Sequence, residues 1–154
     1  MGTTAFDMKD ALIAQMKLIP GIYTLLGEDG YIWDSAYSGI QRPRRLLWVG
    51  EIVWSDDRFV TYGGPSSNKR EEEYNIRVGI EINDGDTEQP AANSKAKAIM
   101  QAVENMVNDD YRKFGIGGLV SVGVSPVGLG EGPGGAEGGR AAFLALQVNV
   151  RARK

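Results

Sequence analysis

The sequence predicts a single α+β domain spanning residues 1–154, in which two helices flank a mainly antiparallel sheet of about four or more strands. Two segments, 4–18 and 89–108, carry apolar residues every three or four positions, which is the spacing of an amphipathic helix. Two others, 71–83 and 140–154, alternate apolar and polar residues, as half-buried strands do. The length suits one domain with a real core, and the chain has no internal repeat.

The first helix is expected over about residues 4–18. Thr4 and Asp7 have the spacing of a capping box, and the apolar stripe ends where Pro20 is followed by Gly21. The stripe consists of Met8, Leu12, Met16 and Ile19. After it, residues 26–40 mix aromatic residues with Gly and Asp, which indicates irregular structure or a short strand.

The middle of the chain predicts strands separated by turns. Residues 46–54 are rich in β-forming side chains and precede the turn residues 55–57, a short strand at 59–62 and a loop at 63–68. The strand at 71–83 is longer than the usual five or six residues. Part of it is therefore expected to project beyond the domain and to pair with something else.

The second helix is expected over residues 89–108, and glycines end the segment 111–118 that follows it. Another alternating strand is expected at 119–127. The next segment, 128–139, holds seven glycines and predicts a flexible arm that becomes ordered by contact with a partner. It leads into the C-terminal strand, whose apolar face consists of Ala142, Leu144, Leu146, Val148 and Val150.

Composition argues against most enzyme classes. The chain contains no cysteine, so it has no disulfide or thiol nucleophile, and no histidine, the commonest metal ligand and general base. We predict no catalytic, metal-binding or cofactor-binding residue and no cofactor, and we predict that the protein is not an enzyme. No apolar run or signal peptide is recognisable, so the chain is expected to be soluble, cytoplasmic when made, and without a membrane partner.

Two short motifs are better explained as local structure. Residues 130–135 satisfy the letters of a dinucleotide-binding glycine motif, but a strand follows them where that motif requires a helix. Residues 84–88 resemble the start of a calcium loop, yet Gln89 and Lys95 stand where the loop requires glycine and glutamate. A turn and an acidic helix start account for the second motif.

Charged and aromatic residues supply the candidates for partner contacts. A run of mixed charge opens the longest strand, where it can discourage aggregation or make complementary contacts with a neighbouring subunit. It comprises Lys69, Arg70, Glu71, Glu72 and Glu73. A basic patch of Arg42, Arg44 and Arg45, together with the basic C-terminus, can face a phosphate backbone. The net charge of −3 favours the alternative, a solvated loop. Trp33, Trp48 and Trp54 are core residues, sheet-packing residues or interface anchors.

The order of these elements resembles the tail-terminator and tail-completion proteins of long-tailed bacteriophages. The resemblance is carried by the first helix and by residues 70–82, 96–104 and 138–153, and it covers most of the chain except 27–45. It implies a small subunit that closes into a hexameric ring, caps the tail tube, ends tube growth and presents a surface to the head connector.

The resemblance also implies a location and partners. The location is the head-proximal end of the virion tail, and the host cytoplasm during assembly. The partners are further copies of the chain, the tail tube protein and a head–tail connector or neck protein, with DNA passing transiently through the lumen. Candidates for the subunit or tube interface are Lys69, Arg70, Glu71, Glu72, Glu73, Gly130, Glu131 and Glu137.

Three alternatives remain open. A neck or head-completion subunit shares the ring symmetry but contacts the connector on the portal side. A nucleic-acid-binding domain uses Arg42, Arg44 and Arg45 and binds duplex DNA with a steep salt dependence. A small-molecule-binding or enzymatic domain relies on Asp, Glu, Lys or Tyr, and the lack of a convergent polar motif disfavours it.

Overall fold

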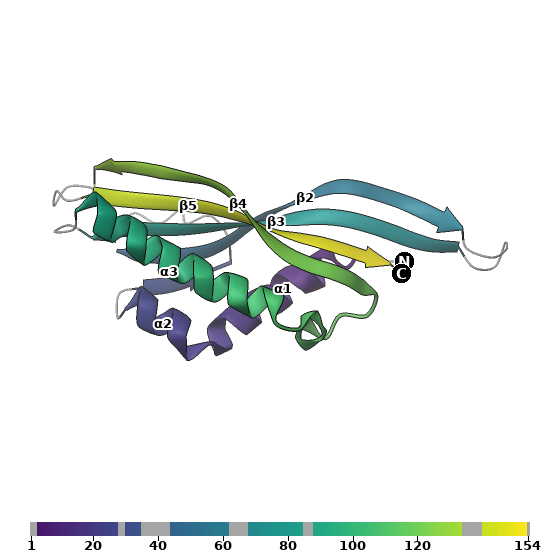
Figure 1. The fold of residues 1–154 in the computed structure, drawn as a ribbon. Coiled ribbons are helices and arrows are strands. Elements are labelled where there is room, and N and C mark those ends of the chain that lie inside the picture. The colour runs from purple at the N-terminus through teal and green to yellow at the C-terminus, as the bar shows by residue number, and fades with distance from the viewer. Residues whose placement is uncertain are drawn as a thin grey trace.

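One five-stranded sheet, with helices packed on one of its faces, organises the protein (Figure 1). The computed structural model describes residues 3–27, 30–34, 44–61, 68–84, 88–133 and 140–153. The elements are α1 (Ala5–Leu18), α2 (Pro20–Leu26), β1 (Gly30–Trp33), β2 (Arg45–Thr61), β3 (Asn68–Asp84), α3 (Gln89–Asn108), the 3-10 helix η1 (Tyr111–Phe114), β4 (Leu119–Pro133) and β5 (Arg140–Arg153).

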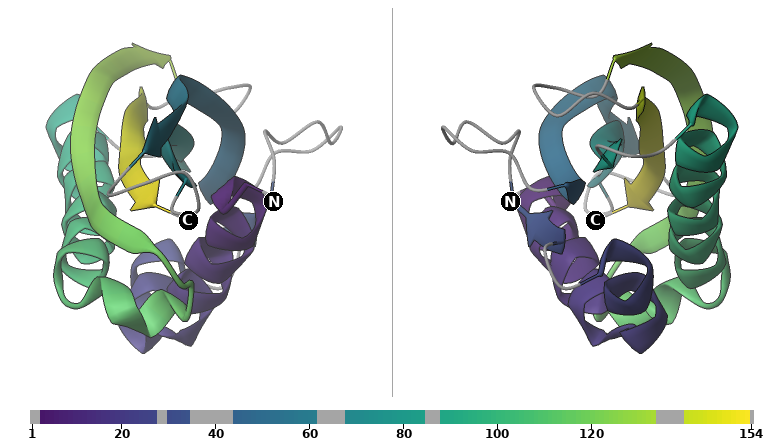
Figure 2. Two further views of the ribbon diagram at one scale, coloured as in Figure 1. Left: turned by 90° about the vertical axis from the view of Figure 1, so that its right-hand side faces the viewer. Right: turned by 90° about the vertical axis from the view of Figure 1, so that its left-hand side faces the viewer.

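The strand order is β1-β2-β3-β5-β4. β1 lies parallel to β2, and every other neighbouring pair is antiparallel. The predicted α+β class with a mainly antiparallel sheet is therefore confirmed. The strands twist strongly, and Figure 2 shows α1, α2 and α3 gathered on one side of the curved sheet. We call this side of the sheet the helix-side face, and the other the far face.

The core lies between the helix-side face and the helices. Alternate residues of β3 and β5 point into it, as their period-2 patterns predicted. These residues are Tyr74, Ile76, Val78, Ile80, Ile82, Ala142, Leu144, Leu146, Val148, Val150 and Ala152. From α3, the predicted stripe is buried except for Met100, which is partly buried. From α1, Met8, Leu12 and Met16 are fully buried.

The strands β2 and β3 form a long antiparallel hairpin that runs past the helices (Figure 1). Each strand has 17 residues, and their pairing extends from Arg45 opposite Ile82 to Thr61 opposite Asn68. β1 accompanies only the first part of β2, from Arg45 to Trp48. On the other side of the hairpin, β5 accompanies β3 as far as Glu71, which lies opposite Arg153.

The predicted turn at 55–57 is wrong, because β2 continues through it. A bulge at Ser55 absorbs one residue, and Asp56 and Asp57 then pair with Glu73 and Glu72 of β3. The Ser55 hydroxyl donates a hydrogen bond to the carbonyl oxygen of Glu73 at 3.1 Å, which holds the bulge against β3. Pairing with a long partner strand thus overrides the local turn preference. The predicted loop at 63–68 overlaps β3 at Asn68, and residues 62–67 lie outside the described part.

Two further boundaries differ from the prediction. α1 ends at Leu18 as predicted, but Pro20 begins a second helix, α2, since the first turn of a helix needs no N–H from that position. β4 was expected to end at Val127, yet it runs to Pro133 because β5 offers a pairing partner over that whole length. Half of the predicted glycine arm is therefore strand, and residues 134–139, including Glu137, lie outside the described part.

The predicted capping box is absent. Thr4 has helical backbone angles and caps nothing with its side chain, which bonds instead to β3.

Among the described helices, none combines the length and the apolar character needed to cross a bilayer.

Candidate functional site

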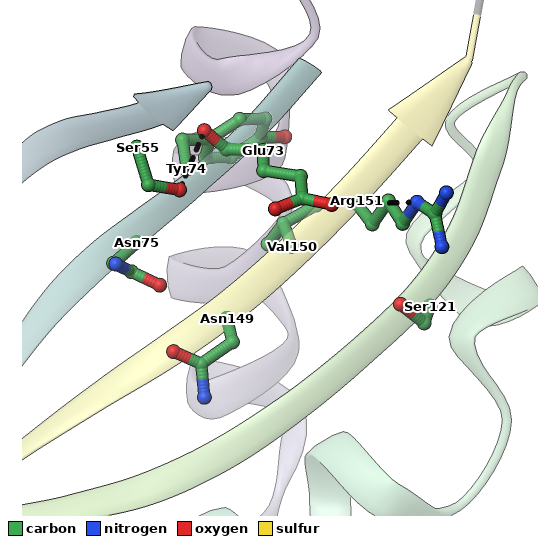
Figure 3. Close-up of a pocket in the computed structure, with 8 residues that line it drawn as sticks. All are labelled: Ser55, Glu73, Tyr74, Asn75, Ser121, Asn149, Val150 and Arg151. Atoms are coloured by element: carbon green, nitrogen blue, oxygen red, sulfur yellow. Dashed lines mark hydrogen bonds and ion pairs between the residues drawn. The ribbon is translucent and has the colours of Figure 1, made fainter. Parts of the chain in front are cut away.

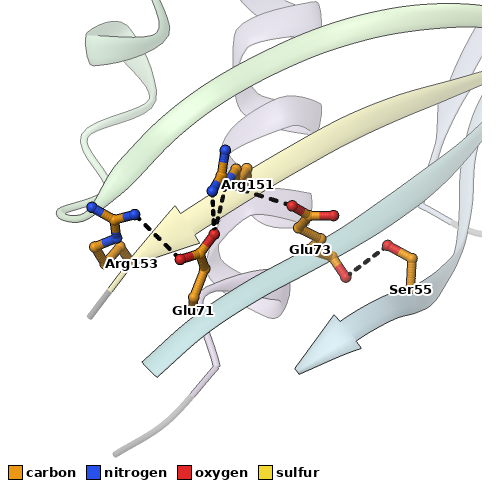
Figure 4. Close-up of polar contacts among 5 residues, drawn as sticks. All are labelled: Ser55, Glu71, Glu73, Arg151 and Arg153. Atoms are coloured by element: carbon orange, nitrogen blue, oxygen red, sulfur yellow. Dashed lines mark hydrogen bonds and ion pairs between the residues drawn. The ribbon is translucent and has the colours of Figure 1, made fainter. Parts of the chain in front are cut away.

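Where β5 ends, the β2–β3 hairpin carries a carboxylate held by two arginines of β5 (Figure 4). We call this level the hairpin base, because residues 59–61 and 68–70 of the hairpin continue beyond it toward the tip. Glu71 accepts hydrogen bonds from Arg151, at 2.8 Å for its Nε and with a shorter contact from Nη2, and from Arg153 Nη2 at 3.2 Å. Glu73 also lies 3.5 Å from Arg151 Nε. The hydrogen bond from Arg151, with a smaller contribution from Arg153, holds the pKa of Glu71 below its usual value although burial opposes this. This cluster joins the C-terminal strand to β3.

On the helix-side face, Glu72 joins the N-terminus to β3. Its carboxylate accepts hydrogen bonds from the Thr4 amide and hydroxyl, both at 2.6 Å, and from the Thr3 hydroxyl at 2.8 Å. The Thr4 hydroxyl also lies 2.9 Å from the Tyr74 phenol oxygen. Burial raises the pKa of Tyr74 to about 12, so the phenol is protonated at neutral pH. The network fixes the start of α1 on the hairpin.

The mixed-charge run at 69–73 is thus divided by the structure. Glu71 and Glu72 are buried and bonded within the chain, and Glu73 contacts Arg151. Lys69 and Arg70 lie next to the hairpin tip, where their backbones pair with Val60 and Phe59. The three glutamates stabilise the hairpin base, and the role of the run in a subunit interface stays a prediction.

The described residues of the predicted basic patch, Arg44 and Arg45, lie far along the sheet from Arg151 and Arg153 of the basic C-terminus. Arg45 donates a hydrogen bond from Nη1 to the carbonyl oxygen of Leu25 at 2.8 Å, in the last turn of α2, while Arg44 is exposed beside it. Arg45 lies opposite Ile82 and Arg151 lies opposite Glu73, which places them about 30 Å apart along β3. Arg42 lies outside the described part.

A shallow pocket of about 330 Å³ opens on the far face at the hairpin base (Figure 3). Its lining residues are Ser55, Glu73, Tyr74, Asn75, Ser121, Asn149, Val150 and Arg151. Several polar groups are already bonded within the protein, including Asn149 Nδ2, which donates to Ser125 Oγ at 2.6 Å. In the described part of the chain, no three or more Asp or Glu side chains are grouped so that they can hold a metal ion. The residues that line the pocket belong to β2, β3, β5 and β4, and several of their polar groups form hydrogen bonds between neighbouring strands.

Trp48 packs flat on the far face, as one of its predicted roles required. Its indole stacks on Phe143 with ring centroids 6.2 Å apart and donates a hydrogen bond to Glu81 at 2.9 Å. A Cβ atom at Gly79 would lie 2.0 Å from the indole, so the bare glycine backbone makes room for the ring. Trp33 and Trp54 are partly exposed, and their roles differ from that of Trp48.

Two exposed apolar groups contain residues that were not anticipated as candidates, although Trp54 was predicted as a possible interface anchor. Phe6 of α1 and Trp54 of β2 form an exposed edge-to-face pair with centroids 6.2 Å apart. Val127 and Leu129 are exposed on β4, the edge strand. Phe6 lies off the buried stripe of α1, so the sequence alone could have indicated that it is exposed. The exposure of Val127 and Leu129 depends on the strand order, which the sequence does not show.

The two described β4 candidates lie close to these apolar residues. Gly130 pairs with Phe143, and Glu131 accepts a hydrogen bond from Asn93 of α3 at 2.6 Å. The end of β4 is therefore fixed to α3 as well as to β5.

No protein-family model and no curated protein sequence matches the chain. Among solved structures, a chain from the virion of a native gene transfer agent particle is similar, with a TM-score of 0.60 and 16% identity. The match covers 99% of this chain and 100% of that chain. At this identity the likeness concerns the fold, and it extends over the whole of both chains.

Proposed function

We propose that this protein is a structural virion protein that forms a homo-oligomeric ring on the end of a phage tail tube. The observation that carries the proposal is the full-length likeness of its fold to a chain of a gene transfer agent virion. In this role the ring ends polymerisation of the tube and presents its other side to the head connector.

The shape of the subunit supports ring formation. A ring needs two different patches on each subunit, so that one patch meets the other on the neighbour. The β2–β3 hairpin extends to one end of the molecule. The end of β4 and the start of β5 lie at the opposite end (Figure 1). Four of the interface candidates fall in these two regions, with Lys69 and Arg70 near the hairpin tip and Gly130 and Glu131 near the end of β4.

The polar clusters fit a structural role. The Glu71 and Glu72 networks connect both ends of the chain to β3, which stiffens the base of the hairpin. A projecting element that is fixed at its base can contact a partner without a large loss of conformational entropy.

Growth of tail tubes in the presence of the protein tests the proposal. Tube protein is polymerised with and without the chain, and tube length and end structure are measured by negative-stain microscopy. We expect shorter tubes that carry a ring of about six copies at one end. Unchanged tubes together with binding to the head connector would favour the neck subunit, and unchanged tubes without connector binding would contradict a role in tail assembly.

A charge-reversal pair tests the hairpin in the same assay. The Lys69→Glu, Arg70→Glu double variant changes the tip, and Lys97→Glu changes an exposed position on α3. We expect the tip variant to lose capping more strongly than the helix variant, because complementary charge contributes to partner choice at an interface.

A further inference from the structure

The sheet has two long strand edges that no other strand covers in the described part of the chain. β1 pairs with β2 only at residues 45–48, so the outer edge of β2 is left without a strand over 49–61. At the other side of the sheet, β4 is the edge strand over its full 15 residues. Unpaired strand edges are templates for pairing with another chain, and soluble proteins commonly protect them with charges.

Most of the β4 edge lacks that protection, since its one charged residue is Glu131, whose carboxylate accepts a hydrogen bond from Asn93 of α3. Residues 119–130 contain no Lys, Arg, Asp or Glu. Val127 is 55% exposed and Leu129 is 49% exposed. Pro126 has no N–H to offer, and a bulge follows it, so a partner strand is best accepted after the bulge, over 127–133, where only the terminal Pro133 lacks an N–H.

The β2 edge carries a matching apolar group. Trp54 is 41% exposed and contacts Phe6, which is 61% exposed. Trp54 lies opposite Tyr74 and Leu129 lies opposite Leu144, and both opposing residues are buried in the core. Residues directly opposite in an antiparallel pair share a face, so Trp54 and Leu129 both point to the helix-side face.

Strand direction also fits. Three antiparallel steps separate β2 from β4, through β3 and β5, so β4 runs opposite to β2. In a ring, a second copy is related to the first by a rotation, so its β4 can lie beside the β2 of the first copy in antiparallel orientation. The two strands then form the perpendicular hydrogen bonds of an antiparallel ladder, and the helix-side faces of both copies lie on the same side of the joined sheet.

We propose that residues 127–133 of one copy pair with the outer edge of β2, within residues 49–61, of a second copy, with Leu129 packed against Phe6 and Trp54. The inference rests on the proposed ring and names the contact that builds it. The contact is heterologous, so each copy uses both edges and the sheet continues from copy to copy until the ring closes.

Three variants test the contact. Leu129→Glu disrupts the β4 side and Trp54→Glu the β2 side, while Leu18→Glu makes the same leucine-to-glutamate change on α1, where Leu18 is 70% exposed. The mass of each variant is measured by light scattering, for the variant alone and for its mixture with tail tubes. Circular dichroism establishes that each variant is folded. We expect Leu18→Glu to form rings like the unmodified protein, and the two edge variants to remain monomeric.

Mixing the two edge variants gives the sharpest result. Leu129→Glu retains an intact β2 edge and Trp54→Glu an intact β4 edge, so an equal mixture is expected to form dimers and nothing larger. Should Trp54→Glu fail to fold, Phe6→Ala tests the same side and is expected to weaken the ring. Rings of normal size from Leu129→Glu would overturn this contact and leave the proposed function standing. If the unmodified chain stays monomeric, both alone and with tubes, the result would instead contradict the proposed ring.

Discussion

At the residue scale, two neighbouring carboxylates do different work on the two faces of β3. Glu72 holds Thr3 and Thr4 at the N-terminus, and Glu71 holds Arg151 and Arg153 near the C-terminus. From the sequence, the acidic run was a candidate for partner contacts. Its internal partners lie 68 to 82 positions away along the chain, and no local pattern indicates contacts at that separation.

Replacing Glu72 with alanine should weaken the fold. The change leaves the buried Thr4 amide and hydroxyl without their acceptor, so we expect a loss of about 2–3 kcal/mol in the free energy of unfolding. Urea denaturation measures it, and Glu88→Ala, at an exposed glutamate, is the control. Equal stability of the two variants would show that the Glu72 network contributes nothing.

Glu71 should make stability depend on pH. Its pKa is lowered from 4.5 in the folded protein, so its contribution is present above that value and is lost as pH falls through the folded pKa. Glu71→Gln should therefore be less stable than the unmodified protein at neutral pH, and the difference should shrink in acid. Denaturation curves at several pH values test this. A difference that grows as pH falls would contradict the assigned ion pair.

At the element scale, the packing of Trp48 across β3 limits what residue 79 can be. A methyl group at Gly79 meets the indole, so we expect Gly79→Ala to cost about 1–3 kcal/mol through overpacking. Gly123→Ala, on β4 with open space around its added Cβ, is the matched control. In the Trp48→Ala background the cost of Gly79→Ala should largely disappear. An unchanged cost there would place the strain elsewhere.

Periodicity predicted the elements whose partners lie on one face, and it missed those fixed by strand pairing. α3 was found because one side of it is buried, and β3 because alternate residues are buried from Glu72 to Ile82. The continuity of β2 through Ser55 depends on β3, and the extension of β4 over 128–133 depends on β5. The turn residues and glycines in those two segments locally indicate loops. The strands that pair with them are distant in sequence, so the local pattern could not show that these segments are strands.

The candidate site was predictable only in part. The hairpin and the end of β4 were expected to carry contacts, and both are prominent in the fold. The exposed apolar residues of β4 were not identified, because a strand becomes an edge only through the order of the whole sheet.

At the scale of the whole molecule, the chain is acidic and several of its arginines are paired with neighbouring carboxylates. The chain has a formal charge of −3. On the far face, Arg77 pairs with Glu51 at 2.9 Å, and Arg151 pairs with Glu71 and Glu73. Arginines held by carboxylates attract a phosphate backbone weakly, which is consistent with the proposed ring and the expected passage of DNA through its lumen.

The unmodified protein should therefore bind duplex DNA weakly and with a shallow salt dependence. Proteins that make 6–10 phosphate contacts lose about 10³–10⁵ in affinity between roughly 50 and 200 mM salt, and we expect no such slope in fluorescence anisotropy. Glu51→Gln releases Arg77, so it should raise DNA affinity at low salt more than Glu88→Gln, which changes the net charge equally at an exposed glutamate of the α3 N-cap. Equal effects would show that the ion pair does not mask Arg77. Tight binding with a steep slope by the unmodified protein would favour the nucleic-acid-binding alternative, because a capping ring must release the DNA that moves through it.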